Sequence, residues 1–79
     1  MKEIAHGIQK GDLVRCQFVE RLFSPTGNTI LGYTSHGDTF LVTEGATSNF
    51  FQSHVEVLHL TLGRVRISAS SLEVISAAR

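Results

Sequence analysis

Short segments in which apolar and polar residues alternate, each closed by a turn signal, constrain this sequence more than any other feature. In residues 13–18, Val14, Cys16 and Phe18 share one face of an extended chain, while Arg15 and Gln17 share the other. Alternation with a period of two is the pattern of a half-buried strand. Turn signals return about every ten residues, and five or six short strands spaced in this way predict an all-β barrel or sandwich.

The other strands are expected where apolar runs lie between glycine, proline and polar residues. Residues 24–28 predict a type I turn, and residues 35–38 predict a tight connection in which Gly37 takes a positive φ. Residues 45–53 read as a loop, and residues 68–71 read as one turn of 3₁₀ helix. The further strands that we expect are 29–34, 39–44, 54–62, 64–68 and 72–75.

The segment 54–62 changes phase along its length. Val55 and Val57 lie on one face of a regular strand, whereas Leu58, Leu60 and Leu62 lie on the other. Two interpretations are open. A β-bulge at Val57 and Leu58 would bend the strand around a small barrel. Otherwise both faces of the strand are buried, one inside the domain and one against a partner.

The length of 79 residues predicts a single domain. It favours a small barrel over an immunoglobulin sandwich, which needs about 100 residues. We divide the chain into an N-terminal arm at 1–11 with a short helical turn, a barrel at 12–76 and a tail at 77–79. A chain this short buries only about 60% of its unfolded surface. Because it has no disulfide pair and no evident structural metal site, oligomerisation is a route to complete its core.

Charge and cysteine content exclude several classes of protein. Seven Lys and Arg balance seven Asp and Glu, so the formal net charge is zero, which argues against sequence-independent coating of nucleic acid. The single Cys16 cannot form an internal disulfide, which favours a reducing cytoplasm. No apolar run has the length of a signal peptide core or a membrane span. We therefore expect a cytoplasmic protein of bacterial or phage type.

Both ends of the predicted barrel resemble small SH3-like barrels. The opening reads Lys-Gly-Asp-Leu-Val-Arg at residues 10–15, and residues 65–75 read as a strand, a 3₁₀ turn and a closing strand. This resemblance implies an all-β fold of five to six strands over most of residues 10–76. Sm-like barrels, which form rings that bind RNA, resemble this layout as well.

The type II plasmid dihydrofolate reductases are SH3-like chains that resemble this one in the same opening and in the segment from Val65 to Ile75. Their active pore uses a glutamine and a tyrosine around the isoleucine of that strand. Arg66 and Ser68 stand at the matching positions here. The resemblance therefore implies the barrel layout, and we do not expect the reductase activity.

The residue pattern predicts no catalytic, cofactor-binding or metal-binding site, and no small-molecule substrate. His54 and His59 are five residues apart and so lie on opposite faces of a regular strand. Cys16 lies on the apolar face of its strand, as a buried small hydrophobe would. We expect a chain that is not an enzyme; an enzyme built at the pore of an oligomer is a third alternative.

An alternative function is nucleic-acid binding, to RNA or DNA, through an arginine patch. Arg15, Arg64 and Arg66 would form such a patch if their strands were neighbours, and Tyr33 could stack on a base. Alternatively, Arg64 and Arg66 are the solvated side of an edge strand, where charge blocks aggregation.

Protein–protein association is the preferred interpretation, because the chain has more apolar side chains than one small barrel can enclose. A contiguous exposed apolar patch marks an interaction site. Alternatively, an N-terminal turn with Ile4 and Ile8 and the 45–53 loop cover this face within the subunit. The sequence predicts a non-catalytic binding or regulatory module that contacts a protein partner or a second copy of itself as a homo-oligomer. The interface residues that we expect are Phe50, Phe51, Leu58, Leu60 and Leu62.

Overall fold

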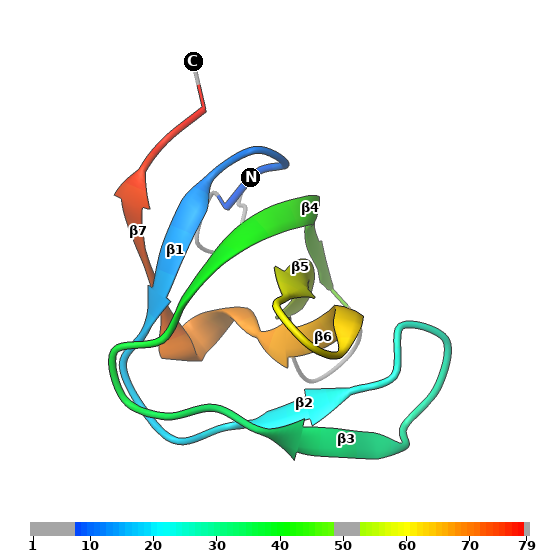
Figure 1. The fold of residues 1–79 in the computed structure, drawn as a ribbon. Helices are drawn as coiled ribbons and strands as arrows, with labels where there is room; N and C mark the ends of the chain where they lie inside the picture. The colour runs from blue at the N-terminus through cyan, green and yellow to red at the C-terminus, as the bar shows by residue number, and fades with distance from the viewer. Residues whose placement is uncertain (1–7, 49–52, 79) are drawn as a thin grey trace.

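The computed structural model describes residues 8–48 and 53–78, which form an all-β chain (Figure 1). One 3₁₀ turn, η1 (Ala69–Ser71), precedes the last strand, as the sequence predicts. The described part has seven strands, one more than the largest number predicted from the sequence. They are β1 (Leu13–Cys16), β2 (Arg21–Phe23), β3 (Ile30–Tyr33), β4 (Thr39–Ser48), β5 (Ser53–His59), β6 (Gly63–Ser68) and β7 (Leu72–Ser76).

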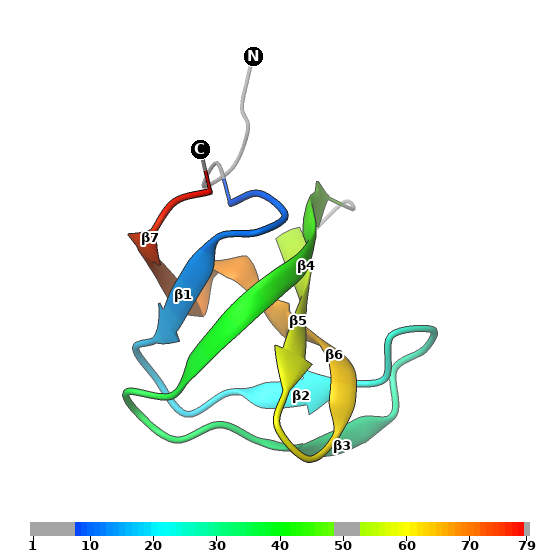
Figure 2. The same cartoon turned by 45° about the horizontal axis from the view of Figure 1, so that its top comes forward.

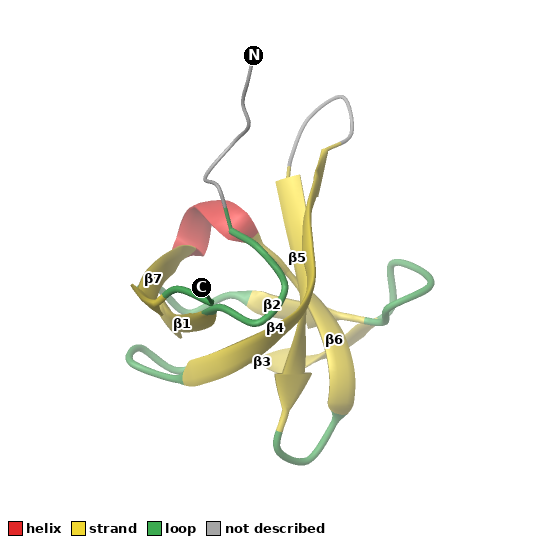
Figure 3. Cartoon of the chain, turned by 90° about the horizontal axis from the view of Figure 1, so that it is seen from above, coloured by secondary structure: helices red, strands yellow, loops and turns green. Residues whose placement is uncertain are grey.

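The strands form one antiparallel sheet in the order β3-β2-β6-β5-β4-β1-β7. The sheet curves strongly, and β2 and β3 lie across its lower end in Figure 2. Seen from above, β7 and β1 lie on one side, β4 and β5 cross the middle, and β6 lies on the other side (Figure 3). The arrangement is compatible with a barrel-like fold. In the described residues, no helix is long and apolar enough to cross a membrane.

The concave side of the sheet holds the core, and alternation predicts its members in most strands. In β1, Val14 and Cys16 are buried while Leu13 and Arg15 are exposed. Phe18 is an exception, because β1 ends at Cys16 and the Phe18 side chain is 58% exposed. The core cluster comprises Ile8, Val14, Cys16, Leu22, Phe40, Val42, Val55, Val57, Val65, Ile67 and Ala69.

Strand β4 continues beyond Gly45, where the sequence pattern had placed its end. A Cβ atom on Gly45 would lie 3.3 Å from the Ile8 carbonyl oxygen. This glycine therefore allows the N-terminal segment to approach the strand, and it does not break the strand. The prediction of a loop at 45–53 is wrong for the residues of that range that belong to β4 and β5, and residues 49–52 lie outside the described part of the chain.

The phase change in segment 54–62 has a simple cause: β5 ends at His59, and Leu60 and Leu62 belong to the turn that follows. The pairing of β5 with β6 runs from His54 to His59 without a register shift. The predicted bulge at Val57 and Leu58 is therefore wrong. The irregularity lies in β4, where the pairing shifts between Val42 and Glu44.

The first and last segments of the described chain meet at the buried carboxylate of Asp12. Its Oδ2 accepts a hydrogen bond from the Gln9 backbone N–H at 3.0 Å, and its Oδ1 accepts one from the Ala78 N–H at 2.8 Å. Gly11 beside it has a φ of 93°. The N-terminal helical turn that we expected falls largely on residues 1–7, which lie outside the described residues.

Candidate protein interface

Three leucines lie side by side on the convex face of the sheet. Leu13 of β1 is opposite Leu41 of β4, and Leu41 is opposite Leu58 of β5. Directly opposed residues of antiparallel strands project to the same side, and the buried Val14, Val42 and Val57 point the other way. The three leucines are 37%, 45% and 48% exposed, so they form an apolar row that no described element covers fully.

The turn between β5 and β6 extends this row. Leu60 has 102% of its reference surface exposed and lines an open groove of about 550 Å³ together with Leu13, Leu41 and Leu58. We call these four residues the leucine surface. His59 shapes the turn, because its Nδ1 accepts hydrogen bonds from the N–H groups of Thr61 and Leu62, both at 3.1 Å. The His59 ring also stacks on Phe40, with centroids 6.0 Å apart.

The structure brings together only some of the predicted interface residues. Leu58 and Leu60 belong to the leucine surface, whereas Leu62 lies against β3: a Cβ on Gly32 would be 3.4 Å from its Cδ1. Phe50 and Phe51 lie outside the described residues. Leu13 and Leu41 were not predicted. The sequence contains a clue to both residues, because each is an apolar residue at a position where the alternation would place a polar, outward-facing side chain.

The alternative interpretation placed Ile4 and Ile8 over this face, but Ile8 is buried in the core and only 4% exposed. Ile4 lies outside the described residues. Among the described residues, the N-terminal segment therefore packs inward, and it leaves the leucine surface open.

Two ion pairs border the leucine surface, one on each side. On one side, Arg15 Nη2 lies 3.0 Å from Glu73 Oε1, with both side chains nearly half exposed. On the other side, Arg64 Nε lies 3.9 Å from Glu56 Oε2, and the Arg64 side chain is 71% exposed. An apolar centre with a charged rim is the usual anatomy of a protein interface.

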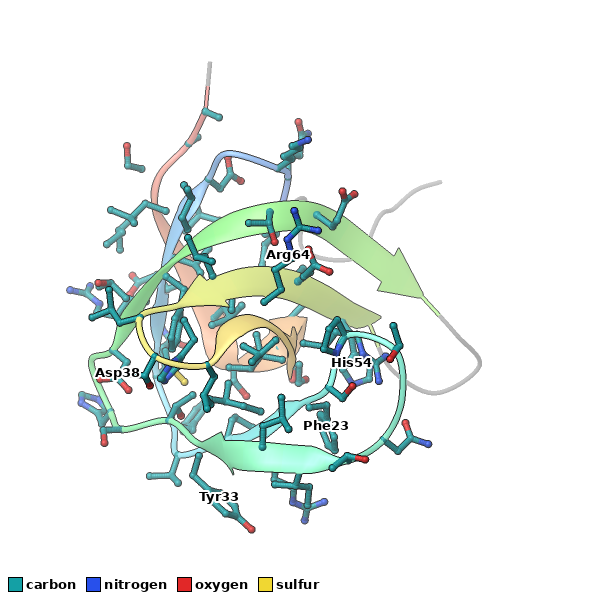
Figure 4. All side chains as sticks on the ribbon, turned by 45° about the vertical axis from the view of Figure 1, so that its right-hand side comes forward. Phe23, Tyr33, Asp38, His54 and Arg64 are labelled. Carbon is teal, nitrogen blue, oxygen red and sulfur yellow. The ribbon has the colours of Figure 1, made fainter. Side chains whose placement is uncertain are left out.

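The predicted arginine patch is not assembled. Arg15 lies on β1, and Arg64 and Arg66 lie on β6, with β4 and β5 between these strands. Tyr33 is 63% exposed on β3, and Figure 4 shows it on the opposite side of the molecule from Arg64. Strand β6 is also not an edge strand, because β2 and β5 flank it. The edge-protection interpretation is therefore wrong, and nucleic-acid binding stays an untested prediction.

Arg66 has a structural partner that sequence reasoning missed. Its Nε donates to the Ser24 carbonyl oxygen at 3.0 Å, and its Nη2 donates to the Gly27 carbonyl oxygen. These two carbonyls belong to the predicted turn between β2 and β3, in which the Gly27 N–H also approaches the Ser24 carbonyl at 3.5 Å. The guanidinium therefore ties the β2–β3 turn to β6.

His54 lies near this arginine, with its ring edge-on to Phe23 at a centroid distance of 6.1 Å (Figure 4). Partial burial lowers the pKa of His54 below its ordinary value of 6.5, because burial disfavours the charged ring. The positive charge of Arg66 lowers this pKa further, while Glu20 acts in the opposite direction.

Cys16 behaves as the small buried residue that its strand position predicts. Its side chain is fully buried, and its Sγ donates to the Phe18 carbonyl at 2.7 Å and lies 3.2 Å from Thr34 Oγ1. In the described residues, no group of three or more His, Cys, Asp or Glu side chains is placed to hold a metal ion.

No protein-family model, curated protein sequence or solved structure matches this chain. Its function is therefore inferred from the geometry of its own surfaces.

Proposed function

We propose that this protein is a small, non-catalytic binding or regulatory module of the cytoplasm that acts through protein–protein contacts as a homo-oligomer, with the leucine surface as its contact. The observation that carries this proposal is the row of Leu13, Leu41 and Leu58, in register across three adjacent strands on the convex face.

The energetic argument rests on exposed apolar area. The four leucines leave the equivalent of more than two fully exposed leucine side chains in water. Complete burial of one such side chain stabilises by about 1.5–3 kcal/mol. A partner that covers the leucine surface would thus gain several kcal/mol before it pays the entropy of association.

The strand order supports an SH3-like barrel as the scaffold. Strands β7, β1, β4, β5 and β6 are consecutive neighbours, and η1 leads directly into β7. The succession of β6, η1 and β7 is the ending that the resemblance implies, and β2 and β3 form a hairpin between β1 and β4 in the chain.

The contacts of Arg66 weigh against the activity of the type II reductases. The type II reductases carry a pore glutamine at the matching position. Here the guanidinium is occupied with the carbonyls of Ser24 and Gly27.

The test compares Leu60→Asp with Phe18→Asp by light scattering across a dilution series. Phe18 is a control, because it is 58% exposed and is not among the residues that line the groove of the leucine surface. We expect the wild-type mass to exceed 8.6 kDa and Leu60→Asp to raise the dissociation constant at least tenfold, with Phe18→Asp unchanged. A wild-type chain that stays monomeric at millimolar concentration, or equal effects of the two variants, would contradict the proposal.

A further inference from the structure

The β3 edge of the sheet has features that edge strands normally avoid. Among the described strands, β3 is one of the two edge strands of the sheet, and it lies at the lower margin of the molecule in Figure 1. Charged side chains are a common protection of such an edge against pairing with another chain. Residues 22–35 contain no charged residue, and within β3 the side chains of Ile30, Leu31 and Tyr33 are 44%, 39% and 63% exposed.

The opposite edge, β7, is protected in the expected way. Glu73 places a carboxylate on it, paired with Arg15 at 3.0 Å. Both edge strands carry a register shift: β7 in its pairing with β1, and β3 in its pairing with β2, where Leu31 has no partner on β2. The two edges therefore differ in charge, and among the described strands only β3 offers an uncharged backbone edge.

We propose that β3 pairs antiparallel with β3 of a second copy of this chain, around a two-fold axis at Gly32. Such an axis runs through the sheet and places one residue opposite its own copy. With Gly32 at the centre, Leu31 of each chain lies opposite Tyr33 of the other. Aromatic and aliphatic residues opposed in this way stabilise an antiparallel pair.

The absence of charge on β3 favours a second copy over a charged partner, because self-pairing places no like charges together. Symmetry favours the centre at Gly32, because the leucine–tyrosine pair then occurs twice, which the alternative centre at Leu31 would not provide.

This contact does not use the leucine surface, so it holds or fails independently of the function proposed above. The first experiment therefore uses the Leu60→Asp background, in which the leucine surface is blocked. Chains with Leu31→Cys are mixed with chains with Tyr33→Cys under mild oxidation. Opposed residues of antiparallel strands have Cα atoms about 4.5–5.5 Å apart, which is within the range of a disulfide.

We expect the mixture to form the mixed disulfide at least tenfold faster than a control mixture of Leu31→Cys with Ile75→Cys. Ile75 lies on the β7 edge and is 40% exposed, close to the 39% of Leu31, and the native Cys16 is buried. Equal rates in the two mixtures would overturn the proposal. Leu31→Cys alone linking to itself as fast as the mixture would overturn the register centred on Gly32.

The second experiment compares Leu31→Lys with Ile75→Lys by light scattering, again in the Leu60→Asp background, so that only the β3 contact can hold two copies together. A lysine at residue 31 places like charges of both copies on one face of the paired strands. We expect Leu31→Lys to raise the dissociation constant at least tenfold and Ile75→Lys to leave it unchanged, with both variants retaining the wild-type circular dichroism spectrum. An unchanged mass for Leu31→Lys, or the same loss for Ile75→Lys, would refute pairing at β3.

Discussion

Replacing Arg66 by methionine tests whether one arginine on β6 stabilises the β2–β3 hairpin. Methionine keeps most of the apolar stem and removes the guanidinium, which donates to the carbonyl oxygens of Ser24 and Gly27. Hydrogen bonds from a charged group contribute about 1.5–3 kcal/mol each. Because Arg66 is only partly buried, solvent replaces part of this, and we expect a net loss of about 2 kcal/mol.

Arg64→Met is the matched control, on the same strand. The Arg64 side chain is 71% exposed, and its nearest carboxylate oxygen, on Glu56, lies 3.9 Å away. The Glu56 side chain is only 17% exposed, but at this distance, with the arginine open to solvent, we expect the pair to contribute at most about 1 kcal/mol. The two variants remove the same chemical group, so the difference between them reports the contacts with the turn.

The assay is urea unfolding at pH 7.5, followed by thermal unfolding. In a domain of this size, each 1 kcal/mol lowers Tm by about 4–8 °C, so Arg66→Met should lower Tm by about 8–16 °C. Amide exchange should also accelerate at Ser24, whose N–H donates to the Thr29 carbonyl at 2.8 Å within the hairpin. Equal unfolding midpoints for the two variants would refute the structural role of Arg66.

Two further predictions concern pH and backbone conformation. Because the pKa of His54 is lowered in the folded state, unfolding takes up a proton between that folded-state pKa and about pH 6.5. The stability that His54 contributes should be full above about pH 6.5 and decrease as pH falls toward the folded pKa. His54→Gln should flatten this decrease between pH 7.5 and 5.5 in urea titrations, and an unchanged slope would contradict the assignment. Gly37 has a φ of 92° with open space around it, so Gly37→Ala should destabilise by about 1 kcal/mol through strain alone. Gly27→Ala, which meets neither strain nor contact, should unfold like the wild type, and equal losses would disprove the strain argument.

The local sequence pattern correctly predicted side-chain burial within single strands and backbone conformation within single turns. Alternation placed Val14 and Cys16 inside, and Gly37 adopts the expected positive φ. The missed strand β2 has only three residues, too few for a period to appear. Phe18 was misplaced because the chain leaves β1 at Cys16, where backbone hydrogen bonds to Gly37 and Asp38 redirect it.

The sequence by itself determined the all-β class, most of the buried residues and the 3₁₀ turn before the last strand, because side-chain direction in a strand repeats every two residues and turns depend on a few neighbours. Only the tertiary structure decided which strands are adjacent. That order aligned Leu13, Leu41 and Leu58, and it separated the strand of Arg15 from that of Arg66. Strand order is set by contacts between residues distant in the chain, and no local pattern encodes it.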